Sequence, residues 1–331
     1  MTPTYVYDTY WRFAAERQAI YERRLQDERG PWTSDPVLRS YRFTNVYRAA
    51  DRVSQYLIRD VQYRSDRLQS PDELFFRTLM FKIFNKIETW EMIEHALGPI
   101  SWHDTDLNAI DQVLDQALRR QVRIYSAAYI MPSPAFGFDR KHANHLALLA
   151  AMMSDRLPLK VQRARSLREV YDSIKPYPGL GPFLAFQYAV DVNYSWLLEF
   201  GEADFVVAGP GARDGIAKCF TDVGRRAPED IIYEMVECQD REFARLGLFF
   251  SGLYGRKLQP IDCQNVFCEI SKYARVAHPE IRGVSDRKRI KQSYRPTARP
   301  LDQPMFPPRW HLTVPFRGPN VALPMRQGQL F

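Results

Sequence analysis

Between residues 166 and 193, two stretches with helical spacing of apolar residues flank the short sequence Tyr177-Pro178-Gly179-Leu180-Gly181. Two glycines allow a tight turn and the close approach of another group, and Pro182 suits the first position of the second helix. The free amides where such a helix begins favour an anion such as phosphate. An ordinary packing corner between two helices has the same pattern, so phosphate binding and simple packing both stay open for this hairpin (177–181).

Most of the remaining chain also has the apolar periodicity of helices, at 10–25, 46–61, 74–97 and 229–248. Strands are expected only at 123–130 and 205–208, without the βαβ alternation of a doubly wound sheet. The prediction is a mainly α fold. One elaborated helical domain would span 1–282, and an irregular, Pro-rich basic tail would span 283–331.

Positive charge is concentrated near the C-terminus. From Lys272 onward there are 12 Lys/Arg and three Asp/Glu, a balance of +9, so with a total of +7 the first 271 residues sum to −2. A basic tail on a near-neutral body fits contact with a phosphate backbone. A solvated tail that improves solubility is the alternative.

Several classes of protein are disfavoured. The four cysteines form no CxxC pair and the six histidines are scattered, so we expect reduced, buried thiols and no metal site. No apolar run approaches the roughly 20 residues of a membrane span. The N-terminus lacks a basic region followed by an apolar run, so we expect no signal peptide, no membrane partner and a cytoplasmic location.

The hairpin resembles the helix-hairpin-helix of DNA repair glycosylases, which reads apolar-Pro-Gly-apolar-Gly. The resemblance implies contact with a DNA phosphate without base specificity. The family's catalytic aspartate would fall at Ala208, and its lyase lysine at Pro182 or Phe183, so both are absent here. An acid must come from elsewhere, and lyase chemistry is not expected. The predicted phosphate-binding residues are Gly179, Gly181, Gly209, Gly211 and Arg213.

Further segments keep a fixed order between residues 10 and 280: Glu16-Arg17-Gln18, Pro31-Trp32-Thr33, 42–48, 51–56, Phe84-Asn85-Lys86, 191–195, 208–212, 262–265, Glu269 and Lys272-Tyr273. Together they resemble a narrower family, the alpha-glutamyl/putrescinyl thymine pyrophosphorylase group with the related helical domain of 5-hydroxymethyluracil DNA kinases. The resemblance implies a glycosylase-like helical fold that handles hypermodified pyrimidines in phage or defence DNA. No GxxxxGK[ST] sequence occurs, so no nucleotide or other cofactor is expected.

Two aspartates are candidate catalytic residues. Asp191 follows the hairpin's second helix, and base excision needs a carboxylate near the sugar C1′ to stabilise an oxocarbenium-like transition state. Helix capping is the alternative for Asp191. Asp262 begins a predicted helical face with Asn265, Glu269 and Lys272. Amides on that face could read a flipped base, or the face could be a buried structural network.

A third cluster lies at 42–52, where charged residues alternate with Tyr and Phe as in a wall that stacks a base. Asn45, Arg48 and Arg52 are expected near one face of a helix, and Asn85 and Lys86 interrupt an otherwise apolar helix. A solvated surface with ion pairs is the alternative. The predicted base- or substrate-binding residues are Arg42, Asn45, Tyr47, Arg48, Arg52, Asn85, Lys86, Asn193, Gln264, Asn265, Glu269 and Lys272.

Three functions fit these features, with double-stranded DNA carrying modified bases as the partner. The first is a monofunctional DNA glycosylase that flips out and excises a bulky hypermodified pyrimidine, such as a glycosylated hydroxymethyl-pyrimidine, to leave an abasic site in anti-phage defence. The second is a transferase that attaches an amine or amino acid to an activated 5-hydroxymethyluracil in DNA. The third is a non-enzymatic DNA-binding module, which the carboxylate and amide clusters disfavour.

Overall fold

The fold is built almost entirely from helices. The computed structural model describes residues 1–27, 29–127, 131–295 and 301–315, and it confirms the mainly α prediction. The described elements are β1 (Thr2–Pro3), α1 (Tyr5–Gln26), α2 (Pro36–Ser40), η1 (Arg48–Ala50), α3 (Arg52–Tyr56), η2 (Leu57–Gln62), α4 (Pro71–Phe84), α5 (Ile87–Leu97), α6 (Leu107–Arg119), α7 (Lys141–Ser154), α8 (Leu157–Gln162), α9 (Leu167–Ile174), α10 (Pro182–Asn193), α11 (Pro210–Cys219), β2 (Phe220–Asp222), α12 (Pro228–Arg245), α13 (Pro260–Ala277) and η3 (Pro308–Trp310).

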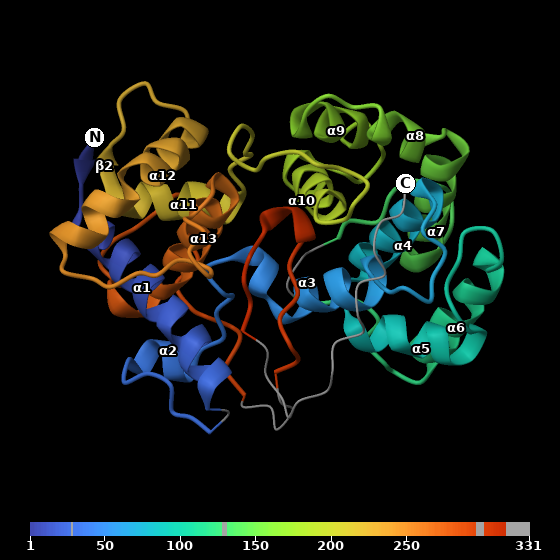
Figure 1. Cartoon of the computed structure of the whole chain (residues 1–331), viewed down its shortest axis with the longest axis horizontal. Coiled ribbons are helices and arrows are strands. Elements are labelled where there is room, and N and C mark those ends of the chain that lie inside the picture. Colours follow the sequence, from blue (N-terminus) through green and yellow to red (C-terminus); the bar gives the residue numbers. More distant parts are fainter. Residues whose placement is uncertain (28, 128–130, 296–300, 316–331) are drawn as a thin grey trace.

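The helices form two groups (Figure 1). One holds α1, α2, α11, α12 and α13, with α13 packed against the other four; the second holds α3 to α10 around α4. The short antiparallel pair β1–β2 lies at the edge of the first group. The chain crosses between the groups at η1, which contacts both α3 and α13. Residues brought to η1 can therefore meet side chains from both groups.

Within the first group, α11 and α13 lie unusually close together. A Cβ added to Gly215 of α11 would stand 2.1 Å from the carbonyl oxygen of Phe267 on α13, so only glycine fits there. The Phe267 ring packs on Tyr10 of α1 at 4.6 Å between centroids, and Tyr10 packs on Trp11 at 4.9 Å. These buried aromatic contacts fix α13 as the central helix of its group.

Two predicted helices are divided by the structure. The segment 74–97 breaks at Asn85, whose left-handed conformation (φ 49°) ends α4 before α5 begins. The segment 46–61 becomes a 3₁₀ turn, the short α3 and a π-helical turn, η2. Asn45 precedes η1, so the prediction that Asn45, Arg48 and Arg52 share a helical face is wrong.

The predicted strand at 123–130 is also absent from its described part, 123–127. There the N–H of Ser126 donates to the carbonyl of Phe84 (2.9 Å), and the carbonyl of Ile124 accepts from the Thr89 hydroxyl (2.8 Å), so no ladder forms. Residues 128–130 lie outside the described residues. The predicted strand at 205–208 pairs with no other described segment. The Ala208 N–H donates instead to the Glu229 carboxylate at 2.8 Å.

The described C-terminal stretches, 283–295 and 301–315, contain no α-helix, but they do not stand away from the helices. Residues 301–315, here called the strap, run between the two groups (Figure 1). The Gln55 side chain both donates to and accepts from the backbone of Met305 at 2.9 Å, and Phe306 is buried. The Arg309 guanidinium donates to the carbonyls of Asn193 and Ser195. The strap thus docks on the helices through its own contacts.

Candidate functional site at the junction of the helix groups

An ion pair buried between the two helix groups forms the centre of the candidate site. The Arg48 guanidinium of η1 faces the Asp191 carboxylate of α10, with Nη1 2.8 Å from Oδ1 and Nη2 2.8 Å from Oδ2. Its Nε donates to Gln187 Oε1 at 2.8 Å. Arg48 is 4% exposed and Asp191 0%. The Nη2 contact is a hydrogen bond and the Nη1 contact an ion pair, and together they hold the guanidinium in one orientation toward the carboxylate.

Lys82 of α4 adds a second cation to this pair. Its Nζ lies 3.4 Å from Asp191 Oδ2 and donates to Asn85 Oδ1 at 2.7 Å. Burial lowers the pKa of Lys82 to about 8, against the opposing effect of Asp191. From the other side, Gln62 donates to the Asp191 backbone carbonyl at 2.8 Å. Asp191 of α10 is therefore held by two other elements of the second group, α4 and η2, and by η1.

One face of α13 positions the segment that carries Arg48. Asp262 Oδ1 accepts from the Arg48 N–H (3.3 Å), and Asn265 donates to the Asn45 carbonyl (2.7 Å). Glu269 accepts from the N–H of Thr44 at 3.1 Å. One turn further, Lys272 pairs with Glu269 at 2.6 Å and lies over the Phe43 ring. The predicted shared face is present on α13, and Asp262, Asn265 and Glu269 bind the backbone of 44–48.

The carboxyl group of Asp262 has a raised pKa. Burial, reinforced by nearby Glu202, raises the pKa of Asp262 to about 7. Its Oδ2 accepts from the Gln259 N–H at 3.0 Å, so the carboxylate caps α13 as well. Glu202, whose pKa burial also raises, pairs with Arg256 at 2.8 Å. The Tyr47 hydroxyl donates to the Arg256 carbonyl at 2.6 Å.

The strap covers this cluster with an aromatic residue. The central carbon of the Arg256 guanidinium lies 4.2 Å from the centroid of the Trp310 ring. The Trp310 ring meets the Tyr194 ring edge-on, with 5.8 Å between the two centroids. Tyr194 in turn lies under Arg48 at 5.6 Å. The indole therefore occupies a slot between a cation and an aromatic ring, an environment that suits a flat π-system.

Other predicted base-binding residues lie at the margin or inside the packing. Arg42 is exposed, and Arg52 and Lys86 both reach Glu88, at 3.7 and 3.4 Å. Asn193 is buried and bonds the backbone of Phe200 through both amide atoms, and Gln264 donates to Cys268 Sγ at 3.1 Å. None of these five side chains contacts the Arg48–Asp191 pair through a hydrogen bond that the described residues show.

Of the predicted phosphate-binding residues, some lie in the hairpin and others are constrained by packing inside the fold. Gly179 has a left-handed backbone (φ 79°), whereas Gly181 has φ −73° and is the exposed N-cap of α10. Gly209 and Gly211 are required by packing, since added Cβ atoms would stand 2.5 Å from the Phe183 ring and 2.9 Å from Cys268 Sγ. Arg213 donates to the Ala208 carbonyl at 3.1 Å and lies 3.4 Å from Glu229.

Sequence reasoning missed several members of the cluster: Gln62, Lys82, Gln187, Glu202, Arg256 and Trp310. A lysine within the apolar run of α4 was a usable signal for Lys82, because a charge among buried residues needs a partner. The remaining residues have no local pattern that sets them apart.

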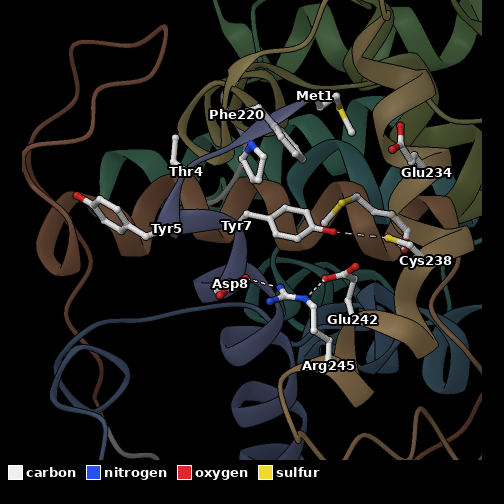
Figure 2. Close-up of a pocket in the computed structure, with 12 residues that line it drawn as sticks. Met1, Thr4, Tyr5, Tyr7, Asp8, Phe220, Glu234, Cys238, Glu242 and Arg245 are labelled. Carbon is white, nitrogen blue, oxygen red and sulfur yellow. Dashed lines mark hydrogen bonds and ion pairs between the residues drawn. The ribbon is translucent and has the colours of Figure 1, made fainter.

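A surface hollow of about 500 Å³ lies elsewhere, between the N-terminus and α12 (Figure 2). There Arg245 stands between Asp8 and Glu242, and the Tyr7 hydroxyl lies 3.8 Å from Cys238 Sγ. No residue of the Arg48–Asp191 cluster lines this hollow. We place the candidate site at the cluster, because buried charges and a carboxyl group with a raised pKa, such as Asp262, are typical of functional sites.

Two features are absent from the described residues. No helix in these ranges is both long and apolar enough to cross a membrane. No group of three or more His, Cys, Asp or Glu side chains there has the arrangement of a metal site.

Comparison with known proteins identifies the family to which the chain belongs. Residues 4–283 match the family described as "5-hmdU DNA kinase, helical domain", and the chain belongs to this family. It is similar to the 5-hmdU DNA kinase of Bacillus phage SP10, with 28% identity over 290 residues that cover 81% of this chain and 45% of the phage protein. The chain thus spans less than half the length of this curated relative. No solved structure is significantly similar.

These findings correct the main functional prediction. The family and the named relative are those of a DNA kinase, so the prediction of a monofunctional DNA N-glycosylase, with its hydrolase chemistry and abasic product, is wrong. They favour the alternative, group transfer onto a modified base. The expectation that no nucleotide takes part no longer follows.

Proposed function

We propose that this chain binds DNA carrying 5-hydroxymethyluracil, or an activated derivative of it, and transfers a group at the 5-substituent with the glycosidic bond left intact. The family match over residues 4–283 carries the proposal. It is a role in modifying the base, in keeping with the name of the phage relative.

The charge of the junction supports an anionic substituent on that base. Four cations, Arg48, Lys82, Arg256 and Arg309, surround the carboxylates Asp191 and Glu202. Guanidinium and ammonium groups bind phosphate oxygens through charge-assisted hydrogen bonds, so these cations could hold an anionic substituent. A phosphoryl or pyrophosphoryl group on the 5-hydroxymethyl oxygen supplies the negative charge and is also a good leaving group.

In the transfer, the nitrogen of an amine or amino acid forms a bond to the methylene carbon as the carbon–oxygen bond breaks. Pyrophosphate leaves with the electron pair, and the proton from nitrogen passes to a base. Asp262 is our candidate for that base, because a pKa of about 7 suits proton transfer near neutral pH. Arg48 and Lys82 would bind the leaving group, and Asp191 would orient both of them.

We further propose that α9, the hairpin and α10 form a helix-hairpin-helix of the glycosylase type that holds a DNA phosphate. The left-handed Gly179 and the exposed start of α10 at Gly181 support this interpretation. Residues Arg42, Arg52 and Lys86 would then approach the DNA at the margin of the junction.

The test supplies duplex DNA with 5-hydroxymethyluracil or its pyrophosphorylated form, with ATP in one arm and a mixture of amines and amino acids in another. Nucleosides are digested and weighed by mass spectrometry. In the amine arm we expect a nucleoside that carries the amine in place of the pyrophosphate and is heavier than 5-hydroxymethyldeoxyuridine. This product should be lost in Asp262→Asn and retained in the exposed control Asp230→Asn. A mass gain with ATP instead would assign phosphoryl transfer. Released bases with abasic sites would refute group transfer.

A further inference from the structure

Exposed cations gather on two segments that are distant in sequence, 39–42 and 287–295. The short bridge between Tyr41 and Ser293 joins them, with the Arg42 N–H donating to the Gln292 carbonyl at 3.0 Å and the Tyr294 N–H to the Ser40 carbonyl at 2.9 Å. We call this surface the basic seam. Its side chains are exposed and form no ion pair within the described residues: Arg39, Arg42, Arg287, Lys288, Arg289, Lys291 and Arg295.

The backbone of the seam is already ordered. Asp214 accepts from the Ser285 N–H at 2.7 Å, and Arg275 of α13 donates to the Arg289 carbonyl at 3.4 Å. Half-buried Ile281 and Ile290 pack against the core on either side. Because this irregular segment is held at several points, binding a ligand there costs little additional ordering.

The charge of the seam is nearly unopposed. Asp286 is the exposed carboxylate within the segment 282–295, and Asp35 near α2 is already bound by the Tyr273 hydroxyl at 2.6 Å. Seven cations on a pinned surface match a regular polyanion, with its dense row of phosphates. The strap, by contrast, offers no such surface, since its Arg309 is bound to Asn193 and Ser195.

We propose that the basic seam is a binding surface for the phosphate backbone of duplex DNA, and that it delivers the strand to the Arg48–Asp191 junction. Arg42 lies on the seam and Arg48 only six residues later, a reach of at most about 20 Å of extended chain. The face of α13 that binds 43–48 fixes the path between them. This inference rests on the proposed function for its substrate, and it names the surface that holds that substrate.

The test measures binding to unmodified duplex DNA of about 20 base pairs by fluorescence anisotropy at several salt concentrations. The seam variant is Arg287→Gln/Arg289→Gln/Lys291→Gln. The control is Arg119→Gln/Arg120→Gln/Arg123→Gln, which removes the same charge from an exposed part of α6 and the turn after it. We expect the seam variant to bind at least about tenfold more weakly and its salt slope to fall by about 2.7, at about 0.9 for each charge. The control should bind within about twofold of the wild type.

Equal weakening in both variants, or none in the seam variant, would overturn the assignment. So would stronger binding of the seam to phosphatidylserine vesicles or to polyglutamate than to DNA at the same salt. The nucleoside mass assay decides the proposed function separately, because it is run with saturating DNA. If the amine-bearing nucleoside forms but the seam variant binds DNA as tightly as the wild type, only the seam assignment is rejected. If the seam variant binds DNA more weakly but no such nucleoside forms, only the group transfer is rejected.

Discussion

Arg48 and Asp191 join the two groups of helices through two parallel contacts of 2.8 Å, one from each terminal nitrogen of the guanidinium. The two residues are 143 positions apart in the chain. Because both are buried, the pair contributes to the fold as well as to the candidate site.

The first prediction concerns this pair. Asp191→Asn keeps the shape but leaves Arg48 and Lys82 buried beside a neutral group, so we expect a loss of about 3 kcal/mol in the free energy of unfolding. Urea denaturation measures it. The control is Asp66→Asn, which breaks the more exposed pair with Arg64 (2.6 Å) and should cost less than about 1 kcal/mol. Similar losses in the two variants would contradict a buried ion cluster.

The second prediction concerns pH. Asp262 has a folded pKa of about 7, raised from 3.8, so the folded state keeps a proton that the unfolded state releases near pH 4. The stabilisation from that proton is complete below about pH 4 and is lost as the pH rises through 7. Relative to Asp262→Asn, the wild type should be more stable at pH 5 than at pH 8. Asp230, the exposed capping residue at the same position of α12, is the control, and Asp230→Asn should show no such change.

The third prediction separates the two hairpin glycines. Gly179→Ala forces a left-handed alanine (φ 79°) whose Cβ stands 3.3 Å from Pro134, and should cost about 1–2 kcal/mol. Gly181→Ala has φ −73° and open space around the new methyl group, so its free energy of unfolding should change by less than about 0.5 kcal/mol. Thermal denaturation of both variants checks this, and an equal cost would show that the hairpin geometry differs from the one described.

The fourth prediction concerns the strap. Trp310→Ala removes the ring that Arg256 and Tyr194 contact, so hydrogen exchange should quicken in 302–312 while α4 stays protected. Trp310→Phe, which keeps an aromatic ring, should restore most of the protection. Unchanged exchange in the alanine variant would mean that Gln55 and Arg309 hold the strap without the indole.

The residues of α13 show what a sequence alone can predict here. A helix with Asp262, Asn265, Glu269 and Lys272 on one face follows directly from the spacing, and the structure has it. What those groups bind does not follow. Their partners lie more than 200 residues earlier, in a segment whose backbone bonds to α13 instead of forming its own helix.

The opposite case is Lys82, which local reasoning passed over. The role of Lys82 in the cluster depends on its ion pair with Asp191, and only the packing of α4 on α10 brings the two side chains together. The helical class and the polar residues of the cluster are local properties of the sequence. The pairing of charges across the junction and the docking of the strap are tertiary, so no periodicity predicts them.

Trp310 fills a slot in its own chain, between Arg256 and Tyr194. Because it is tethered to that slot, its effective concentration there is on the order of millimolar. Any base or aromatic group that takes its place must compete with that concentration. Its apparent dissociation constant is therefore its intrinsic one divided by the fraction of molecules whose strap is open. The same factor applies to every competing base, and a substituent that also attracts the nearby arginines offsets it.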